Sequence, residues 1–493
     1  PLPPLDACSY VLELLPAFAY LDQMGLVYCD FKIENALVEG ETVKLIDLGA
    51  VRRAGDPGGD IYGTKGYAAP EANDDPTAVS DLYTVGRALA LLITDFDFQG
   101  QYERTLPPPA SAAVFGQHPS LYRFLLKATR TDPTSRFQSA DEMAGQLQGV
   151  LRDVAAGTGV LAPVDSAVFD ADIPGEGDNL WGDGIATHRL PSLRPVATDP
   201  ATPAIIAAAM VPDPRRRLAL LEAAWADHPD SFDLPYRLAG AALEGGAPDS
   251  VVNGWLSVAE NAQPGDWRSS WLRGQLALAR GDAPTAMHSF DIVLAELPGE
   301  LAPKLALGYA YELAGQLDPA AGYFDLVSRA DPTYTSAAFG LARCQRRRGD
   351  RAGAVAALER VPSSSSRYES ARVAMVEVLL DDDPRPPAED ELARAAEVLA
   401  QLEGAAMLAV HRLAARLLLD AARALEGGGG GAMAGGGGGA PGTGTLLGIP
   451  RRVDALRAGA ERELRTCAHL AATREERIRY VDEANRARPF TLV

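Results

Sequence analysis

The feature that most constrains the fold is a pattern with a period of 34 residues in the second half of the chain. Five positions of one copy return in the next as small residues, an aromatic residue and a proline, in the same order. A third copy keeps part of the pattern, and weaker matches lie one period upstream. A repeat of this length predicts stacked helical pairs, because one such unit cannot bury its apolar face alone. The matching positions are Gly274, Gly281, Ala286, Phe290 and Pro298, then Gly308, Gly315, Ala320, Phe324 and Pro332, then Gly349, Ala354 and Leu358, with Gly240 and Pro264 upstream.

This pattern resembles the tetratricopeptide repeat. In such a unit, small residues let two helices approach, the aromatic side chain fills the space between them, and proline ends the second helix. An alanine-rich helical bundle is the alternative interpretation, and the shared positions favour the repeat. We expect repeats over residues 201–387 and further helices over 388–493, with a disordered glycine-rich loop at 427–448. Residues 156–200 are rich in Gly, Pro and Asp and predict a linker or an extended arm.

Residues 1–155 mix element types. A helical period over residues 11–21 is closed by Gly25, a short hairpin turns at residues 39–41, and helices follow from Thr77. Between the first helix and the hairpin stands "VYCDFKIEN", residues 27–35, which brings Asp30, Lys32 and Asn35 close together in the chain. Asp47 lies at the end of the hairpin, in "IDLGAV".

These side chains match the needs of phosphoryl transfer, which depends on positioning and charge neutralisation more than on covalent chemistry. A carboxylate such as Asp30 can accept the proton of an attacking hydroxyl, and a cation such as Lys32 can steady the phosphoryl oxygens. The oxygens of Asn35 and Asp47 suit magnesium, which is a hard cation. The Asp-x-Lys-x-x-Asn pattern alone is a weak signal.

The ordered set of motifs is much more specific. After Asp47 come "YGTKGYAAPE" (62–71), "SDLYTVG" (80–86) and "DPTSRF" (132–137), and in this order the chain resembles the eukaryotic-type protein kinases, from their catalytic loop to the end of their large lobe. The resemblance implies that Asp30 is the catalytic base, that Lys32 contacts the γ-phosphate of ATP, and that Asn35 and Asp47 hold Mg²⁺. It further implies a hydrogen bond from Thr64 to the catalytic aspartate, an ion pair between Glu71 and Arg136, and an anchoring role for Asp81 on the catalytic-loop backbone.

More narrowly, the chain resembles the actinobacterial protein kinase G family, which joins a kinase domain to a tetratricopeptide domain in this order. The phrases "GLVYCDFKIEN", "VKLIDLGAV", "DLYTVGRALA" and "GELAPKLAL" carry the resemblance over nearly the whole chain. The implied fold is a mainly α-helical kinase large lobe over residues 1–155, followed by an all-α repeat domain. The implied activity is that of an ATP- and Mg²⁺-dependent serine/threonine kinase. Its acceptor would be a protein of the forkhead-associated-domain type that regulates glutamate and 2-oxoglutarate use, and the repeats would bind a peptide or protein; a homodimer is left open.

Two departures from the kinase pattern bear on this interpretation. Ahead of Asp30 the 493 residues hold no Gly-x-Gly-x-x-Gly loop and no strand lysine, so the small lobe is missing and the chain alone is expected to be inactive. We expect an upstream segment to carry both. Cys29 replaces the arginine that often receives a phosphorylated activation loop; a packed thiol is favoured over a redox-sensitive one. The alternative to an active kinase is a pseudokinase scaffold whose repeats bind partner proteins.

Composition limits the compartment and the partners. A net charge of -20 argues against nucleic acid as the main partner. The four cysteines are widely spaced, which favours a reducing cytoplasm over a disulfide framework or a zinc site. The most apolar run, residues 405–419, is interrupted by His411, Arg412 and Arg416 and predicts an amphipathic helix rather than a membrane span.

Overall fold

The computed structural model describes residues 1–40, 42–56, 63–156, 165–171, 181, 190–383, 385–402, 407–428 and 444–489. The chain divides into two compact units. Unit 1 comprises Pro1–Asp178 and Gly184–Asp331, and unit 2 comprises Asn179–Asp183 and Pro332–Val493. The first unit therefore joins the expected kinase lobe to the earlier repeats, and the division falls inside the segment expected as one repeat domain.

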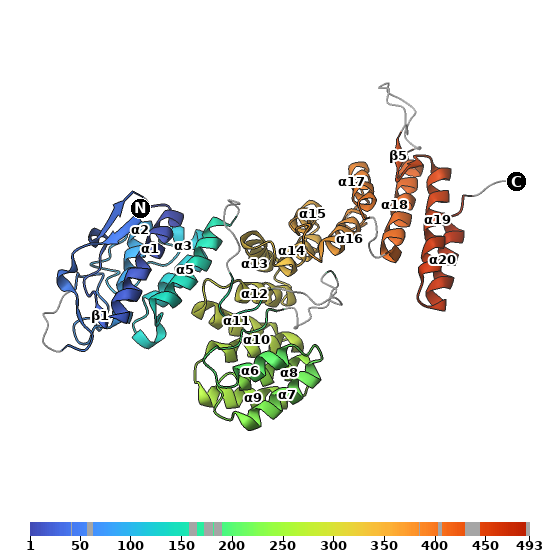
Figure 1. The fold of residues 1–493 in the computed structure, drawn as a ribbon. Helices are drawn as coiled ribbons and strands as arrows, with labels where there is room; N and C mark the ends of the chain where they lie inside the picture. Colours follow the sequence, from blue (N-terminus) through green and yellow to red (C-terminus); the bar gives the residue numbers. More distant parts are fainter. Residues whose placement is uncertain are drawn as a thin grey trace, which may run out of the picture. The chain divides into compact units, whose positions relative to one another are not determined.

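The N-terminal lobe of unit 1 follows the order expected from the sequence, with a long helix, a hairpin and further helices (Figure 1). Two small antiparallel sheets pair β1 with β4 and β2 with β3. Pro16 lies inside the first helix, and Gly25 after it has a φ of 67°, the left-handed conformation that ends the helix. The elements are α1 (Pro4–Gln23), β1 (Leu26–Val27), β2 (Ala36–Glu39), β3 (Thr42–Leu45), β4 (Arg52–Arg53), α2 (Ala78–Ile93), α3 (Ala113–Gln117), α4 (Pro119–Ala128) and α5 (Ala140–Ala155).

One apolar core holds this lobe together. Helices α1, α2, α4 and α5 contribute Leu15, Val85, Leu121 and Leu147, all of which are buried, and Phe137 joins them from the loop before α5. Helix α2 is buried along most of its length, so it forms the centre of the lobe. Phe31 of the catalytic loop also lies in this core, which fixes the loop to the scaffold.

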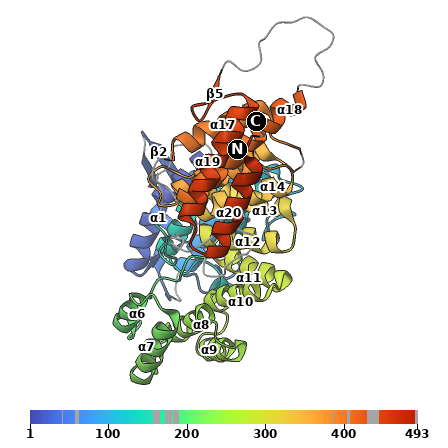
Figure 2. The ribbon, with the colours of Figure 1, turned by 90° about the vertical axis from the view of Figure 1, so that its right-hand side faces the viewer.

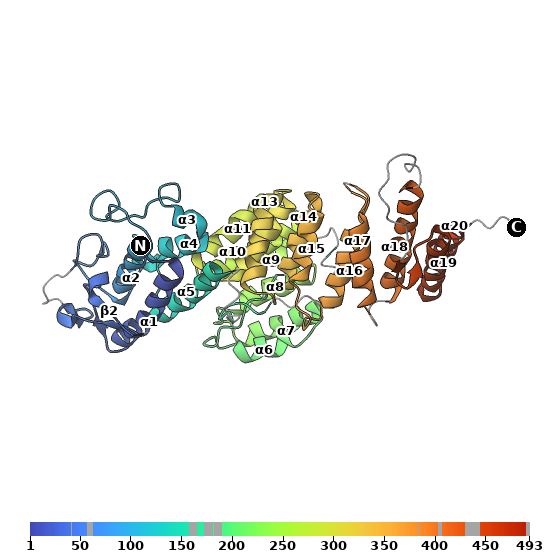
Figure 3. The ribbon, with the colours of Figure 1, turned by 90° about the horizontal axis from the view of Figure 1, so that it is seen from above.

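The remainder of unit 1 is a series of helices, α6 (Thr202–Ala209), α7 (Pro214–Asp227), α8 (Leu234–Glu244), α9 (Asp249–Ala262), α10 (Trp267–Arg280), α11 (Ala283–Glu296), α12 (Leu301–Leu313) and α13 (Leu317–Ala330). Helices α10 and α11 form one hairpin, as Figures 1 and 3 show. Helices α12 and α13 form the next (Figure 1). The repeated residues explain the packing: a Cβ on Gly308 would lie 2.7 Å from the ring of Phe324, and Gly274 faces Phe290 in the same way. The helical pairs predicted from the period are confirmed.

The arm before the repeats lies on these helices. Of the segment expected as a linker, residues 157–164, 172–180 and 182–189 lie outside the described residues. Residues 168–170 and 192–194 form a short antiparallel bridge, and the buried ring of Phe169 packs 4.8 Å from that of Trp271. The described parts of the arm are therefore docked on the repeats rather than extended.

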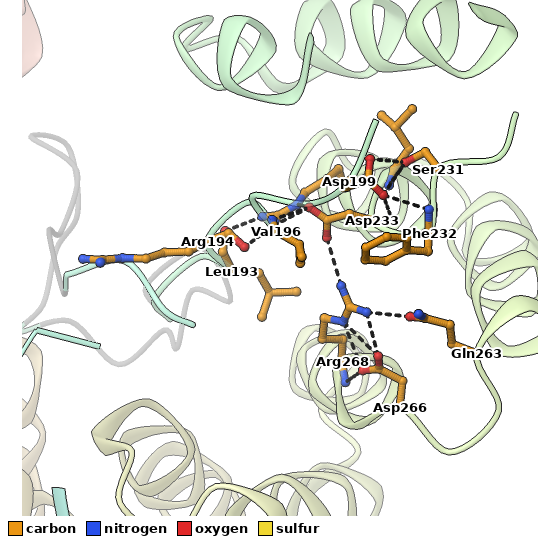
Figure 4. A network of polar contacts seen from close by, with 12 residues as sticks. Leu193, Arg194, Val196, Asp199, Ser231, Phe232, Asp233, Gln263, Asp266 and Arg268 are labelled. Atoms are coloured by element: carbon orange, nitrogen blue, oxygen red, sulfur yellow. Dashed lines mark hydrogen bonds and ion pairs between the residues drawn. The ribbon is translucent and has the colours of Figure 1, made fainter. Parts of the chain in front are cut away.

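A buried polar network fastens the arm. Figure 4 shows Asp233 between Val196 of the arm, whose N–H donates to it over 3.2 Å, and Arg268 of α10, also at 3.2 Å. Arg237 pairs with Asp233 at 2.9 Å and donates to the carbonyl oxygens of Leu193 and Arg194. Asp233 is fully buried, and a buried carboxylate is costly unless it is paired. The two arginines compensate its charge.

The N-terminal lobe is joined to the repeats within unit 1. Lys304 of α12 forms a 2.5 Å ion pair with Asp153 of α5, and both side chains are buried. Close by, Gly149 and Gly299 approach so closely that a Cβ on Gly149 would lie 2.7 Å from the Gly299 carbonyl carbon. The Gly299 N–H donates to Gln146 over 2.9 Å. Lys304 belongs to the "GELAPKLAL" phrase, so this segment forms the joint between the lobe and the repeats.

Unit 2 continues the helical pairs with α14 (Thr335–Arg347), α15 (Arg351–Glu359), α16 (Tyr368–Leu379), α17 (Glu389–Ala400), α18 (Met407–Gly428), α19 (Val453–Leu470) and α20 (Arg474–Ala487). Helices α18, α19 and α20 lie side by side (Figure 2). Most of the expected glycine loop, residues 429–443, lies outside the described residues. Its end was wrongly predicted, since β5 (Thr445–Leu446) pairs with β6 (Ile449–Pro450). Among the described helices, α18 included, none has the length and apolar character to cross a membrane.

Candidate active site

The catalytic loop and the β2–β3 hairpin bring the candidate magnesium ligands to one place. The hairpin register pairs Ala36 with Leu45, and the Ile46 N–H donates to the Asn35 carbonyl oxygen over 2.9 Å. Asp47 follows Ile46 directly, so Asp47 and Asn35 lie close together at the open end of the hairpin. The Asn35 amide nitrogen donates to the backbone oxygen of Asp30 over 2.8 Å, which leaves its side-chain oxygen available as a ligand.

The Asp30 carboxylate is held from two sides. Thr64 Oγ1 donates to Asp30 Oδ1 over 2.8 Å, and Lys32 Nζ lies 3.1 Å from Asp30 Oδ2. The side chains of Asp30 and Lys32 are 21% and 27% exposed, so a substrate hydroxyl can reach them. The structure brings together the predicted base, the predicted γ-phosphate contact and the predicted acceptor-site threonine.

Asp81 of α2 anchors the start of the catalytic loop. Its carboxylate accepts hydrogen bonds from the backbone N–H groups of Tyr28 at 2.7 Å and Cys29 at 2.9 Å. Burial raises the pKa of Asp81 to about 7, although the two hydrogen bonds oppose the shift. Cys29 has a φ of 70°, a left-handed conformation that costs a residue with a side chain about 1–2 kcal/mol. The two bonds to Asp81 help to hold this conformation.

Glu71 and Arg136 form an ion pair at the base of the lobe. Arg136 donates from Nη1 and Nη2 to the two carboxylate oxygens of Glu71 over 2.6 and 2.8 Å, and Ser80 donates to the same carboxylate over 2.8 Å. Burial acts to raise the pKa of Glu71, but the hydrogen bonds from Arg136 and Ser80 outweigh it and lower that pKa. The guanidinium of Arg136 also lies over the ring of Tyr83 at 4.8 Å. This pair fixes the segment after Thr64 to the rest of the lobe.

The donor set fits magnesium held partly by nucleotide phosphates. Within the described residues there is no cluster of three or more His, Cys, Asp or Glu that could hold a metal ion alone. Asn35 and Asp47 supply oxygen ligands, and Mg²⁺ in kinase sites takes one or two protein carboxylates together with phosphate oxygens and water. Asp47 is exposed, and its Oδ1 accepts only a long 3.3 Å bond from the Gly49 N–H. The residues present therefore fit the metal that the motif implies.

Three residues near the site were missed by the sequence reasoning. The Tyr28 hydroxyl donates to the backbone oxygens of Ile46 and Asp47 at 2.5 and 3.0 Å, which ties the loop to the second predicted metal ligand. Arg87 is fully buried and donates to the carbonyl oxygen of Gly66 over 2.8 Å. Burial raises the pKa of Cys29, and Arg52, on the strand that pairs with β1, is close enough to oppose that shift. Tyr28 and Arg87 lie inside the quoted motifs, so their position was a usable signal.

The Cys29 thiol has the properties of a packed side chain. It is 7% exposed, and burial raises its pKa to about 11 despite the nearby Arg52. A thiol with such a pKa is almost entirely protonated at neutral pH and is therefore a weak nucleophile. The chemistry of this position favours the packed thiol over the redox-sensitive one.

Comparisons with known proteins cover both halves of the chain. Residues 2–108 match the model of the protein kinase domain, and residues 185–491 match the model described as the protein kinase G tetratricopeptide repeat. The serine/threonine-protein kinase PknG of Mycobacterium leprae is 35% identical over 100% of this chain and 66% of its own length. PknG of Mycolicibacterium smegmatis is 34% identical over 99% of this chain and 66% of its own length.

A different kinase matches a smaller share of the chain. The serine/threonine-protein kinase PknL of Mycobacterium tuberculosis is 32% identical over 31% of this chain and 43% of its own length. Of the two PknG relatives, by contrast, the chain spans 66% of the length of each. Because the repeat model covers well over half of the residues and the kinase model matches the lobe that holds Asp30, the chain belongs to the protein kinase G family.

Proposed function

We propose that the N-terminal lobe is the catalytic lobe of a serine/threonine protein kinase, which transfers the γ-phosphate of ATP to a protein hydroxyl. The observation that carries the proposal is the partly exposed Asp30 carboxylate, held between Thr64 and Lys32. In this role Asp30 accepts the proton of the attacking hydroxyl, and Thr64 keeps the carboxylate turned toward the acceptor. Lys32 steadies the phosphoryl oxygens during transfer.

Asn35 and Asp47 are the residues that would hold Mg²⁺, which when bound neutralises the phosphate charge. The Tyr28 hydroxyl keeps the Asp47 backbone beside the catalytic loop, so both ligands stay in register. Asn35 and Asp47 stand at the two ends of the same hairpin, and Asp47 takes a left-handed backbone conformation there, with a φ of 59°.

Resemblance to the family supports finer proposals. The acceptor would be a forkhead-associated-domain protein that regulates glutamate and 2-oxoglutarate use, and the repeats would bind a peptide or protein partner. A cytoplasmic location and a homodimer belong to the same set of proposals. Kinase activity accounts for the site residues better than a pseudokinase scaffold does, because the base, the cation and both oxygen ligands are present together.

The test is phosphate transfer from labelled ATP with Mg²⁺ to a forkhead-associated-domain acceptor. Residues 1–493 are compared alone and joined behind a kinase small lobe that carries the glycine loop and strand lysine. The joined protein should label the acceptor, and Asp30→Asn in it should reduce the rate by about 10²–10⁴-fold, the usual contribution of a general base. ATP affinity should be unchanged.

The matched control is Asp75→Asn, which removes an exposed carboxylate of the same lobe and should leave the rate unchanged. A rate of phosphate transfer that falls less than about threefold on Asp30→Asn would show that Asp30 is not the general base. Equal background labelling in the joined wild type and the Asp30→Asn variant would favour the scaffold instead.

A further inference from the structure

A cavity of about 270 Å³ lies between the docked arm and helices α6, α7, α8 and α10. It is in the repeats of unit 1 and shares no residue with the kinase site. The hydrogen bonds from Arg237 to the arm and the pairing of Asp233 with Arg237 and Arg268 fix the arm side of the cavity. The cavity is therefore bounded by a fastened wall and by packed helices, as small-molecule sites usually are.

The charges that line the cavity are already compensated. Arg217 pairs with Glu244 at 2.6 Å. Asp170 lies 3.6 Å from Arg194, and Arg237 is committed to Asp233 and two carbonyl oxygens. With two cations and two carboxylates in the lining, a charged ligand finds no free counter-charge and would have to break an existing pair.

The other lining groups are apolar or neutral. Leu193, Ile205, Leu221 and Leu272 form apolar wall. Among the residues that the structure describes, the half-buried side-chain amide of Gln275 on α10 has no hydrogen-bond partner, and an amide can both donate and accept. A ligand that fits must place apolar surface against the leucines and one neutral polar group near this amide.

We propose that this cavity binds a small, uncharged organic molecule that combines an apolar body with a neutral hydrogen-bonding group. Such a ligand keeps the Arg217–Glu244 pair intact, covers the leucine wall and satisfies the Gln275 amide. The proposal is independent of the kinase assignment, because it rests on the arm and the repeats alone.

The experiment uses fluorine NMR line broadening of four probes with the same ring, added to the 493-residue chain. They are para-fluoroacetophenone, which is neutral and has an acceptor, para-fluorotoluene, which is neutral without one, para-fluorobenzoate, which is an anion, and para-fluorobenzylamine, which is a cation. The ketone should bind with a dissociation constant on the order of 1 mM, as expected for so few non-hydrogen atoms. The other three should bind about tenfold more weakly.

Variants locate the binding. Ala209 lines the cavity and is exposed at its edge, so Ala209→Trp should fill the entrance without disturbing the core and weaken ketone binding at least about tenfold. Ala207→Trp is the matched control, an exposed position of the same helix outside the lining, and should bind like wild type. Gln275→Leu keeps the side-chain volume but removes the amide, so it should abolish the preference for the ketone over para-fluorotoluene.

Three results would overturn the proposal. The first is no broadening of the ketone, and the second is equal ketone binding by the Ala209→Trp and Ala207→Trp variants. The third is tighter binding of the benzoate or the amine than of the ketone, which would show that a charged ligand is preferred. Circular dichroism of each variant confirms that a loss of binding is not a loss of fold.

Discussion

At the level of single residues, polar side chains of the kinase lobe form hydrogen bonds that hold the backbone of the catalytic loop, residues 28–35. Asp81 holds two N–H groups, Tyr28 reaches the oxygens after the hairpin, and Thr64 turns the Asp30 carboxylate. In the proposed mechanism the reacting group is the partly exposed Asp30, whereas Asp81 and Tyr28, which position the loop that carries it, are buried. This separation is what a preorganised site requires, because the positioning groups must not move during the reaction.

Asp81 gives the lobe a pH dependence. Its pKa is raised to about 7 by burial, so the folded lobe favours the protonated carboxyl relative to the unfolded chain. The contribution of Asp81 to the free energy of unfolding is therefore largest below about pH 4 and declines as the pH rises through about 7. Asp81→Asn leaves one buried N–H without its acceptor and should cost about 1–3 kcal/mol.

Because asparagine does not ionise, the free-energy gap between wild type and Asp81→Asn should be larger at pH 5 than at pH 8. Guanidinium unfolding of both proteins at the two pH values measures it, with the exposed Asp75→Asn as the control. A gap that widens as the pH rises would show that the pKa of Asp81 is low instead.

At the scale of elements, the α10–α11 and α12–α13 pairs each depend on a glycine that admits the ring from the facing helix. Gly308 in α12 and Gly274 in α10 meet Phe324 and Phe290, both fully buried. The turn glycines have left-handed φ values, for example 71° at Gly315. The 34-residue period therefore arises because the same packing contact and the same turn recur in successive helical pairs.

The contrast between two glycines of one helical pair tests this account. Gly308→Ala should lower the free energy of unfolding by about 1–3 kcal/mol, because the new methyl group meets the Phe324 ring. Gly322 in α13 is exposed and has open space beyond its Cα, so Gly322→Ala should stabilise by about 0.5–1 kcal/mol through helix propensity. Denaturant unfolding measures both, and equal effects of the two substitutions would contradict the packing argument.

The joint between α5 and α12 is a second test at this scale. Burial lowers the pKa of Lys304, although Asp153 opposes the shift. Each charge is therefore unfavourable in this buried place without its partner. Lys304→Met alone should destabilise by about 3–5 kcal/mol, because it leaves the Asp153 carboxylate buried without its partner. Adding Asp153→Leu should recover most of the loss. Chemical unfolding of the single and double variants measures this, and a double variant as unstable as the single one would show that the pair itself is strongly stabilising.

At the scale of the whole molecule, the kinase lobe and the first repeats belong to one compact unit. Besides Lys304 and Asp153, Arg130 pairs with Glu296 at 2.7 Å and Lys127 lies 3.5 Å from the same carboxylate. Lys127 is almost wholly buried, at 5% exposure, so removal of the repeats would expose a surface built to be covered. The compact unit that contains the lobe therefore extends beyond residue 155.

Chain length tests this unit directly. Residues 1–331 should melt in a single cooperative transition, and residues 1–200 should melt at least about 5 °C lower and aggregate, because the α4–α5 surface loses its cover. Thermal melting followed by circular dichroism, with light scattering for aggregation, compares the two pieces. Equal melting temperatures would mean that the lobe is independent of the repeats.

Local spacing along the chain was enough to predict the repeats and the order of the candidate site residues. The spacing of Asp30, Lys32, Asn35 and Asp47 predicted the proposed phosphoryl-transfer chemistry. The 34-residue period from Gly274 to Gly308 predicted the helical pairs, because each copy repeats the same packing contact and the same turn. Family motifs added Glu71 with Arg136, which no spacing could pair.

Only the tertiary structure decided the contacts between distant segments. The docking of the arm through Asp233 and the joint between Asp153 and Lys304 join residues far apart in the chain, and they follow no period. Such pairs form only when whole surfaces fit, since burial of a charge is tolerated where a partner from another element meets it. A composition rich in Gly, Pro and Asp predicted an arm, but composition carries no information about the surface on which an arm comes to lie.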